Sequence, residues 1–332
     1  MMKDTAVMIP SLEEIATPLL APIEPGPADL IPGLMPRKGQ LVIAGETNMG
    51  KSLLALEIIS SLVTGNPLWG ELQPTAKVNK VLYVLGEHYR EVVQRLATHT
   101  KLPFTDSTLI IGPEQLQSDK RLVSRGEPNM LSLSKFKRWA EGVDFIVFDP
   151  LSAFISGIDV ENDNIQMRLV LDMMSLIAQT SGASCLVLAH KGKPMIDFKT
   201  GQERGRQSYG IRGASAIEDA ATNIFYLEKG DNTDTSRVAH GQIYELKLRK
   251  FKGEAPSEFR LLRNPVNLTH ALLGNRPYSE VLRLDARAKL ARIKTDNPGF
   301  DDRTAIKVLA SVEGISEETL RRRVGLQDLE YV

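Results

Sequence analysis

Residues 40–52 read QLVIAGETNMGKS, an apolar run that leads into a turn containing glycine. The run QLVIAG (40–45) predicts a buried strand, and GKSLLALEIISSLVTG (50–65) predicts a helix that ends at Gly65. A strand that passes through a short turn into a helix is the opening half of a βαβ unit. The stretch therefore predicts an α/β fold.

Strand and helix patterns alternate from this stretch to about residue 265. Apolar runs predict further strands at KVLYVLG (80–86), STLII (107–111), DFIVFD (144–149) and SCLVLAH (184–190). Helical patterns lie at HYREVVQRLATH (88–99), at about 164–180 and, more briefly, at ASAIEDAA (214–221). Three late strands follow one another as NIFYLEK, QIYELKLRK and SEFRLLR. We expect a mostly parallel central sheet flanked by helices, with an antiparallel extension at one edge.

The two ends of the chain differ from its centre. Residues 1–35 are rich in proline and predict an arm with little regular structure, whereas residues 36–268 form the predicted α/β domain. Residues 269–332 predict a small C-terminal helical segment. Within it, residues 301–324 have the spacing of two helices joined by a short turn, with Ser316 as an N-cap. This pair fits a plain helical cap and a DNA-reading helix-turn-helix equally well.

The composition is that of an ordinary folded domain. The 332 residues are 42% hydrophobic and 25% charged with a net charge of zero, so any nucleic-acid affinity must come from local basic patches. Cys185 is the one cysteine, so a disulfide framework within the chain is excluded, and its apolar strand pattern predicts a buried residue. No secretion signal or membrane-spanning run is recognisable, and we expect a cytoplasmic protein that does not bind membranes.

The turn GETNMGKS (45–52) fits the pattern G-x-x-x-x-G-K-[ST] and stands between a strand and a helix, as that pattern requires. Backbone N–H groups of such a turn face phosphate oxygens, and the helix N-terminus adds a positive dipole. Lys51 is expected to reach the β- and γ-phosphates, and Ser52 to bind magnesium. A glycine-containing turn without a ligand is the alternative. The predicted nucleotide contacts are Gly45, Glu46, Thr47, Asn48, Met49, Gly50, Lys51, Ser52 and Leu53.

Three polar residues end three other predicted strands. Asp149 ends FIVFD and is the predicted second magnesium anchor, although it also fits a turn residue before proline. Because Pro150 cannot act as a base, Glu87, at the end of KVLYVLGE, becomes the candidate. Glu87 could instead be the N-cap or a first-turn residue of the next helix. His190 ends SCLVLAH and could touch the γ-phosphate or simply bond to backbone.

This order of segments resembles the RecA superfamily, and within it the RepA-like hexameric helicases of plasmids and phages. The likeness covers about residues 30 to 265 and is carried by LIPGLMPRKGQLVIAGETNMGKSLLALEIISSLVTGNPLWGE, KVLYVLGE, FIVFDPLSAF, LVLAHKGKP and RGASAIEDAATNIFYLEK. The resemblance implies a RecA-like P-loop ATPase core that uses ATP and Mg²⁺. It also implies a homo-oligomer, in the form of a hexameric ring, and single-stranded DNA as partner.

The resemblance implies roles for matching residues. Glu87 matches the catalytic glutamate, Asp149 the magnesium-binding aspartate and His190 the polar sensor. RKFKGEAPSEF (249–259) resembles the stretch that carries basic fingers, which points to Lys250 and Lys252 as groups that reach the neighbouring subunit's γ-phosphate. One departure is that family helicases commonly have two histidines at the sensor, where this chain has alanine and histidine.

Residues 191–213 predict a long basic loop without an apolar period. By analogy it is the central-pore loop, where basic groups can follow the phosphates of single-stranded DNA. A solvated loop whose charges touch nothing is the alternative. The predicted nucleic-acid contacts are Lys193, Lys199, Arg204, Arg206 and Arg212.

Two functions follow from these patterns. The first is an ATP-hydrolysing ring motor on single-stranded DNA, a helicase of a plasmid, phage or mobile element. The second is an ATP-dependent DNA-binding switch or adaptor, or a recombination or replication mediator, without unwinding. A metabolic kinase is disfavoured because the sequence has no clear lid or acceptor-site signature.

Overall fold

The computed structural model describes most of the chain, and the account below is confined to that part. The described residues are 29–87, 90–116, 121–124, 126–156, 164–190, 214–230, 242–250, 258–273, 286–287, 289–291, 293–313 and 316–324.

Within these residues, the main sheet has nine strands in the order β14-β13-β12-β11-β3-β10-β8-β4-β5. Its parallel part consists of β3 (Gln40–Gly45), β4 (Val81–Leu85), β5 (Thr108–Ile111), β8 (Phe145–Asp149), β10 (Ser184–His190) and β11 (Asn223–Lys229). The antiparallel part consists of β12 (Gln242–Lys250), β13 (Glu258–Arg263) and β14 (His270–Leu272). The predicted mostly parallel sheet with an antiparallel extension is therefore confirmed.

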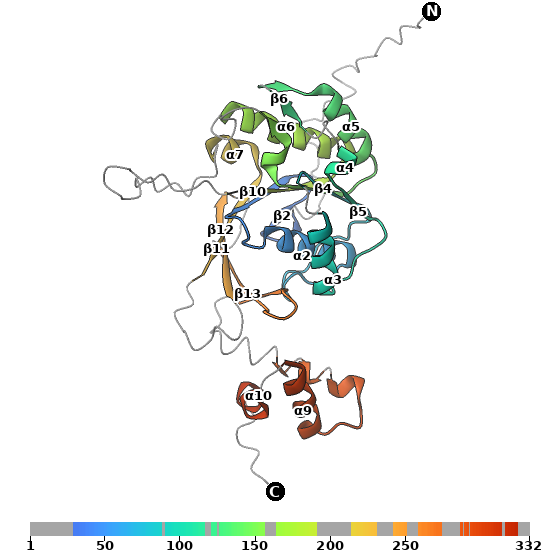
Figure 1. Ribbon diagram of the computed structural model, residues 1–332, viewed down its shortest axis with the longest axis vertical. Helices are drawn as coiled ribbons and strands as arrows, with labels where there is room; N and C mark the ends of the chain where they lie inside the picture. Colours follow the sequence, from blue (N-terminus) through green and yellow to red (C-terminus); the bar gives the residue numbers. More distant parts are fainter. Residues whose placement is uncertain are drawn as a thin grey trace, which may run out of the picture.

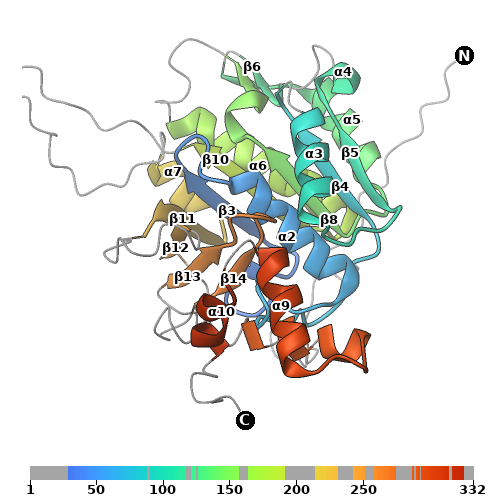
Figure 2. The same ribbon diagram turned by 60° about the horizontal axis from the view of Figure 1, so that its bottom comes forward.

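Helices cover both faces of this sheet (Figures 1 and 2). On one face lie α2 (Lys51–Thr64) and α3 (Arg90–Thr100), and on the other α5 (Met130–Ala140), α6 (Asn164–Ser181) and α7 (Ala214–Ala220). Residues of β3 alternate between the two cores: Leu41 and Ile43 pack with α2, whereas Val42 and Ala44 pack with α5 and α6. The predicted α/β fold class, a mostly parallel central sheet flanked by helices on both faces, is confirmed.

Smaller elements join these layers. They are β1 (Asp29–Ile31), β2 (Met35–Pro36), α4 (Pro113–Leu116), β6 (Val123–Ser124), β7 (Glu127–Pro128), the 3-10 helix η2 (Leu151–Phe154) and β9 (Ile155–Ser156). The buried thiol of Cys185 lies in β10, where burial raises its pKa to about 12, as expected for a core residue.

Both predicted domain boundaries need adjustment. We assigned residues 1–35 to an arm, but β1 and β2 pair with each other and bury Ile31 and Met35 completely in the core that contains α2. We began the C-terminal segment at residue 269, but β14 pairs with β13 and continues the sheet. Neither β1 and β2 nor β14 has a clear apolar period in the sequence. Packing against α2 and pairing with β13 make these strands part of the main domain.

The predicted helix pair near the C-terminus is present as α9 (Asp302–Glu313) and α10 (Glu317–Val324). The backbone N–H of Thr319 donates to the Ser316 hydroxyl at 3.1 Å, so the predicted N-cap is confirmed. Leu309 and Leu320 belong to a small apolar core of residues 286–320 that is separate from the two cores of the main sheet. None of the described helices is long and apolar enough to cross a membrane.

Candidate functional site

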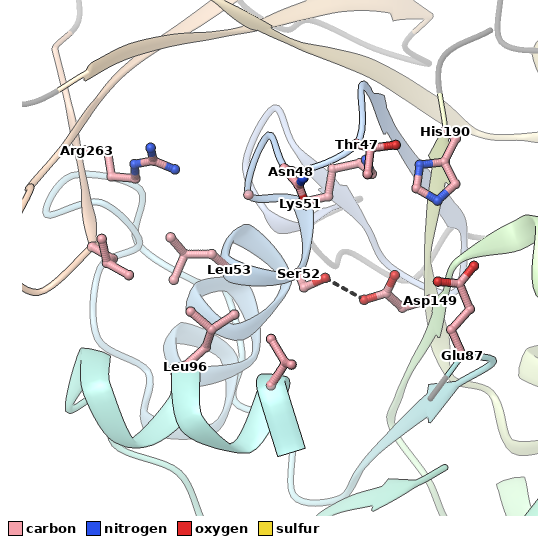
Figure 3. Close-up of a pocket in the computed structure, with 13 residues that line it drawn as sticks. Thr47, Asn48, Lys51, Ser52, Leu53, Glu87, Leu96, Asp149, His190 and Arg263 are labelled. Carbon is pink, nitrogen blue, oxygen red and sulfur yellow. Dashed lines mark hydrogen bonds between the residues drawn. The ribbon is translucent and has the colours of Figure 1, made fainter. Parts of the chain in front are cut away.

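A cavity of about 500 Å³ opens at the carboxyl end of the parallel strands (Figure 3). It has two contrasting sides. One side, which we name the polar end, carries Ser52, Glu87, Asp149 and His190, and the other, which we name the apolar end, carries Leu53, Leu96 and Arg263. Val92 and Leu268 also line the cavity. The turn between β3 and α2 runs between them and contributes Thr47, Asn48, Gly50 and Lys51.

The backbone of this turn needs its glycines. Gly50, the N-cap of α2, has φ 97°, a left-handed conformation that residues with a side chain rarely adopt. A Cβ on Gly45 would lie 2.9 Å from the carbonyl oxygen of Leu227 on the neighbouring β11. Of the predicted nucleotide contacts, the cavity lining includes Thr47, Asn48, Gly50, Lys51, Ser52 and Leu53. It does not include Gly45, Glu46 or Met49, and Met49 is packed in the core.

Lys51 is buried in the middle of the turn. Its Nζ donates to the carbonyl oxygens of Gly45 and Glu46 at 2.9 and 2.7 Å. Burial lowers the pKa of Lys51, while the negative charges of Asp149, Glu46 and Glu87 act in the opposite direction. The amine is thus held at the centre of the turn, beside the backbone N–H groups that a phosphate would meet.

Asp149 is buried at the end of β8 and accepts two short hydrogen bonds. The hydroxyls of Ser52 and Tyr83 both donate to its Oδ2 at 2.8 Å. We did not predict Tyr83, although a tyrosine inside the apolar run KVLYVLG was a usable signal, because a buried phenol normally needs a hydrogen-bond partner. Ser52 and Asp149 offer hard oxygen ligands, which fits Mg²⁺ held partly by protein and partly by phosphates.

Glu87 stands beside Asp149 because β4 and β8 are neighbours, with Leu85 opposite Asp149. The backbone N–H of Gly86 donates to the carbonyl oxygen of Asp149 at 2.8 Å, and a side chain on Gly86 would collide with Ala153. The carboxylate of Glu87 is exposed and faces the cavity. Glu87 lies in a bend, and α3 is described from Arg90 onwards.

His190 ends β10 directly opposite Gly45 of β3. Burial lowers the pKa of His190, as does the nearby charge of Lys51, while Glu87 and Asp149 oppose the shift. Its Nδ1 is buried and has no hydrogen-bond partner among the described residues. The imidazole is half-buried and lines the polar end of the cavity.

Of the remaining predicted site residues, only Lys250 belongs to the part of the chain that the structure describes, and it does not line this cavity. Lys250, at the end of β12, donates to the carbonyl oxygen of Glu218, and the adjacent Arg249 pairs with the carboxylate of Glu218 at 2.7 Å. Lys252 lies outside the described residues, as do all five predicted DNA contacts: Lys193, Lys199, Arg204, Arg206 and Arg212.

The apolar end was not predicted apart from Leu53. Val92 and Leu96 come from α3, while Arg263 and Leu268 come from β13 and the turn after it. None of these residues forms a motif, because they meet only through the packing of α3 and the antiparallel extension around α2. Alternation along β13 places Arg263 on one face, but the sequence alone does not tell which face that is.

Comparison with known proteins adds a family. The family described as AAA domain matches residues 6–195, which is more than half of the chain. No curated protein sequence matches this chain significantly.

Solved structures with a similar course of the chain include two archaeal proteins and a helicase. A KaiC-like protein from Pyrococcus horikoshii is 14% identical, with a TM-score of 0.45 over 75% of this chain and 95% of its own. The flagellar accessory protein FlaH from Methanocaldococcus jannaschii is 14% identical, with a TM-score of 0.45 over 72% and 90%. A DnaB-like replicative helicase is 13% identical, with a TM-score of 0.48 over 71% and 57%.

Proposed function

The chain belongs to the AAA domain family, and we propose that it hydrolyses ATP as a ring-forming motor on single-stranded DNA. The observation that carries the hydrolytic part is the polar end of the cavity. There, the P-loop lysine, a hydroxyl–carboxylate pair, an exposed carboxylate and a neutral imidazole border one space. This is the set of groups that hydrolysis of a phosphoanhydride requires.

In this proposal the turn at residues 45–52 binds the phosphates and Lys51 neutralises charge on the β- and γ-phosphates. Ser52 and Asp149 would hold Mg²⁺, which supplies further neutralisation of the phosphate charge. Tyr83 keeps Asp149 in place, because its hydroxyl is bonded to the same carboxylate oxygen that Ser52 meets.

Glu87 is the proposed general base. It accepts a proton from the water that attacks the γ-phosphate, a task that Pro150 beside Asp149 cannot perform. Its exposure supports this role, because the carboxylate is open to water. His190, with an unpaired Nδ1 at the same end of the cavity, is the proposed contact to the γ-phosphate.

A homo-oligomer, most simply a hexameric ring, would complete the site in this proposal. Lys250 and Lys252 are the proposed fingers that reach the neighbouring subunit's γ-phosphate. The position of Lys250 supports this role, because it does not line the cavity of its own chain and is held by α7. The basic loop residues Lys193, Lys199, Arg204, Arg206 and Arg212 would contact single-stranded DNA. A cytoplasmic location remains part of the prediction.

A second function is an ATP-dependent switch or mediator on DNA that does not unwind it. Two observations favour it. Only one histidine, His190, stands at the sensor position. In addition, α9 and α10 share a small core of their own, as expected for a module that contacts DNA or a partner protein.

The hydrolytic proposal is tested by Glu87→Gln. We expect the variant to bind ATP with unchanged affinity and to lose at least a hundredfold in turnover, the usual contribution of a general base. Glu91→Gln is the matched control, since Glu91 is an exposed carboxylate on the nearby α3 outside the cavity lining. Hydrolysis retained by Glu87→Gln would contradict the assignment.

Motor and switch are separated with the same proteins. Strand displacement on forked DNA with ATP, lost in Glu87→Gln and retained in Glu91→Gln, would support the motor. Hydrolysis that is stimulated by single-stranded DNA without displacement would support the switch.

A further inference from the structure

The apolar end of the cavity takes no part in the hydrolysis proposed above. Figure 3 shows Leu53, Leu96 and Arg263 on the side of the turn that faces away from Asp149, Glu87 and His190. Val92 and Leu268 also line the cavity, and Arg263 is the one cationic side chain of the lining that lies on this side of the turn. An apolar surface with a single planar cation has little use for a triphosphate, but it suits an aromatic ring.

The direction of a bound nucleotide follows from the two ends. This step depends on the proposed function: the γ-phosphate then lies at the polar end, beside Glu87 and Asp149. The phosphate chain follows the turn at residues 45–52. The nucleoside must therefore leave the turn on the opposite side, over Leu53 and towards Arg263.

The fold fixes which way Arg263 faces. Side chains alternate along a strand, and on β13 both Phe259 and Leu261 pack in the core that contains α2. Arg263, two residues further on, faces the same way. One guanidinium nitrogen, Nη1, lies 3.4 Å from the point that a Cβ on Gly50 would occupy, so the group stands beside the N-terminus of α2.

A cation beside a helix N-terminus is electrostatically unfavourable unless something holds it there. Here the guanidinium carbon of Arg263 lies 4.5 Å from the centre of the Tyr244 ring, whose π-face attracts a cation. Tyr244 is buried, and its ring meets the ring of His270 edge to face at 5.7 Å. No carboxylate among the described residues forms an ion pair with Arg263, and the Tyr244 side chain is the group that holds its guanidinium.

His270 is fixed in turn by the P-loop helix. Its Nδ1 and backbone N–H lie 2.8 and 2.5 Å from the two carboxylate oxygens of Glu57, a buried residue of α2. Trp69 also donates to Glu57, at 3.1 Å. A continuous set of contacts thus runs from α2 through His270 and Tyr244 to Arg263, and it holds the arginine rigidly at the rim of the cavity.

We propose that Arg263 binds the nucleoside part of the nucleotide, with its guanidinium, supported by Tyr244, stacked on the base above Leu53. Arg263 contacts the substrate directly, whereas Tyr244 is a positioning residue. Stacking on a flat cation accepts every base, because each base has a π-face. ATP and GTP are therefore expected to depend on Arg263 to a similar degree.

The test compares nucleotides with inorganic tripolyphosphate, which has the phosphate chain but no nucleoside. Dissociation constants for ATP, GTP and tripolyphosphate are measured by calorimetry in the presence of Mg²⁺ for the wild-type chain and for Arg263→Ala. We expect Arg263→Ala to bind ATP and GTP about tenfold more weakly, the loss typical of one stacking contact, and tripolyphosphate as the wild type does. Arg260→Ala is the matched control, because Arg260 is on the same strand but faces the other side.

A second variant separates stacking from charge. Arg263→Lys keeps the positive charge but loses the planar guanidinium that would stack on the base. We therefore expect this variant to bind ATP as weakly as Arg263→Ala does. Full ATP affinity in Arg263→Lys, or equal losses for all three ligands, would overturn the proposal in favour of a phosphate contact. Unchanged affinities in Arg263→Ala would overturn it as well. A wild-type chain that binds neither ATP nor tripolyphosphate would instead refute the proposed function.

Discussion

The two ends of the cavity are built in different ways. At the polar end, Asp149 and His190 end β8 and β10, and Glu87 follows β4; these strands are parallel neighbours whose carboxyl ends meet. At the apolar end, Arg263 comes from the antiparallel extension, which continues the same sheet beyond β11. The side chains of the polar end are thus brought together by neighbouring strand ends. Those of the apolar end meet only because α3 and the antiparallel extension both pack around α2.

The two ends also differ in what holds their key side chain. The hydroxyls of Ser52 and Tyr83 fix Asp149, and the carboxylate that accepts both hydrogen bonds itself lines the cavity. Arg263 is held by aromatic contacts that lead to the buried Glu57, which does not line the cavity. Disturbing the polar end should therefore affect turnover first, and disturbing the support of the apolar end should affect stability first.

The largest effect is expected at the polar end, from Asp149→Asn. The amide keeps the shape of the carboxylate and can still accept the two hydroxyls, but it removes the negative charge that would face Mg²⁺. We expect the ATP turnover number to fall about a thousandfold, in the range of losses seen when a charge-stabilising group is removed. The unfolding free energy should change little. Steady-state hydrolysis over a magnesium titration, with urea denaturation alongside, measures both.

Asp172→Asn is the control for this change. Asp172 is exposed on α6 and pairs only with Arg168, one turn away at 2.9 Å, so its loss should leave turnover unchanged. If Asp149→Asn lost stability rather than turnover, Asp149 would be a structural anchor, and the contrast between the two ends would disappear.

At the apolar end the largest expected effect is on stability, from Glu57→Ala. The substitution leaves the buried N–H groups of Trp69 and His270 without an acceptor. We expect the free energy of unfolding to fall by about 3 kcal/mol, the cost of a few unpaired buried donors. Chemical denaturation followed by circular dichroism gives this value.

An exposed glutamate provides the comparison for Glu57. Glu91→Ala on α3 should change the unfolding free energy by no more than about 0.5 kcal/mol. A Glu57→Ala variant as stable as the wild type would show that the buried set of contacts does not hold the extension against α2. The argument that Tyr244 and Arg263 are rigidly supported would then fail.

Much of the parallel core was predictable because its rules are local. The runs NIFYLEK and QIYELKLRK coincide with β11 and β12, and Gly65 ends α2 as expected. Its N–H donates to the carbonyl oxygen of Ser61, the usual closure of a helix by a left-handed glycine. Glu87 was found because a proline after Asp149 excluded the neighbouring position, and the register of β4 and β8 places it beside that aspartate.

What was missed depends on contacts between distant segments. The helix α5 was not predicted, although Leu133, Phe136 and Ala140 are buried at helical spacing. The strands β1 and β14 are only three residues long, too short for a periodic signal. Arg263 could not be chosen over the neighbouring Arg260, because only the completed sheet shows which of the two faces the P-loop helix.

The smallest expected effect concerns His190 and acid. Burial and the charge of Lys51 lower its pKa in the folded chain below the ordinary value of about 6.5, so the folded state binds this proton less readily than the unfolded state. Stability should therefore fall as the pH drops from about 6.5 towards the folded-state pKa. His190→Gln should flatten this part of the pH profile in urea denaturation, whereas His99→Gln, on an exposed part of α3, should leave it unchanged.

The positive charge of Lys51 disfavours a second positive charge on His190. If only His190→Gln loses the dependence of unfolding free energy on pH, the polar end keeps its imidazole neutral. An equal slope in both variants would place the acid sensitivity elsewhere and remove His190 from the groups that distinguish the polar end from the apolar end.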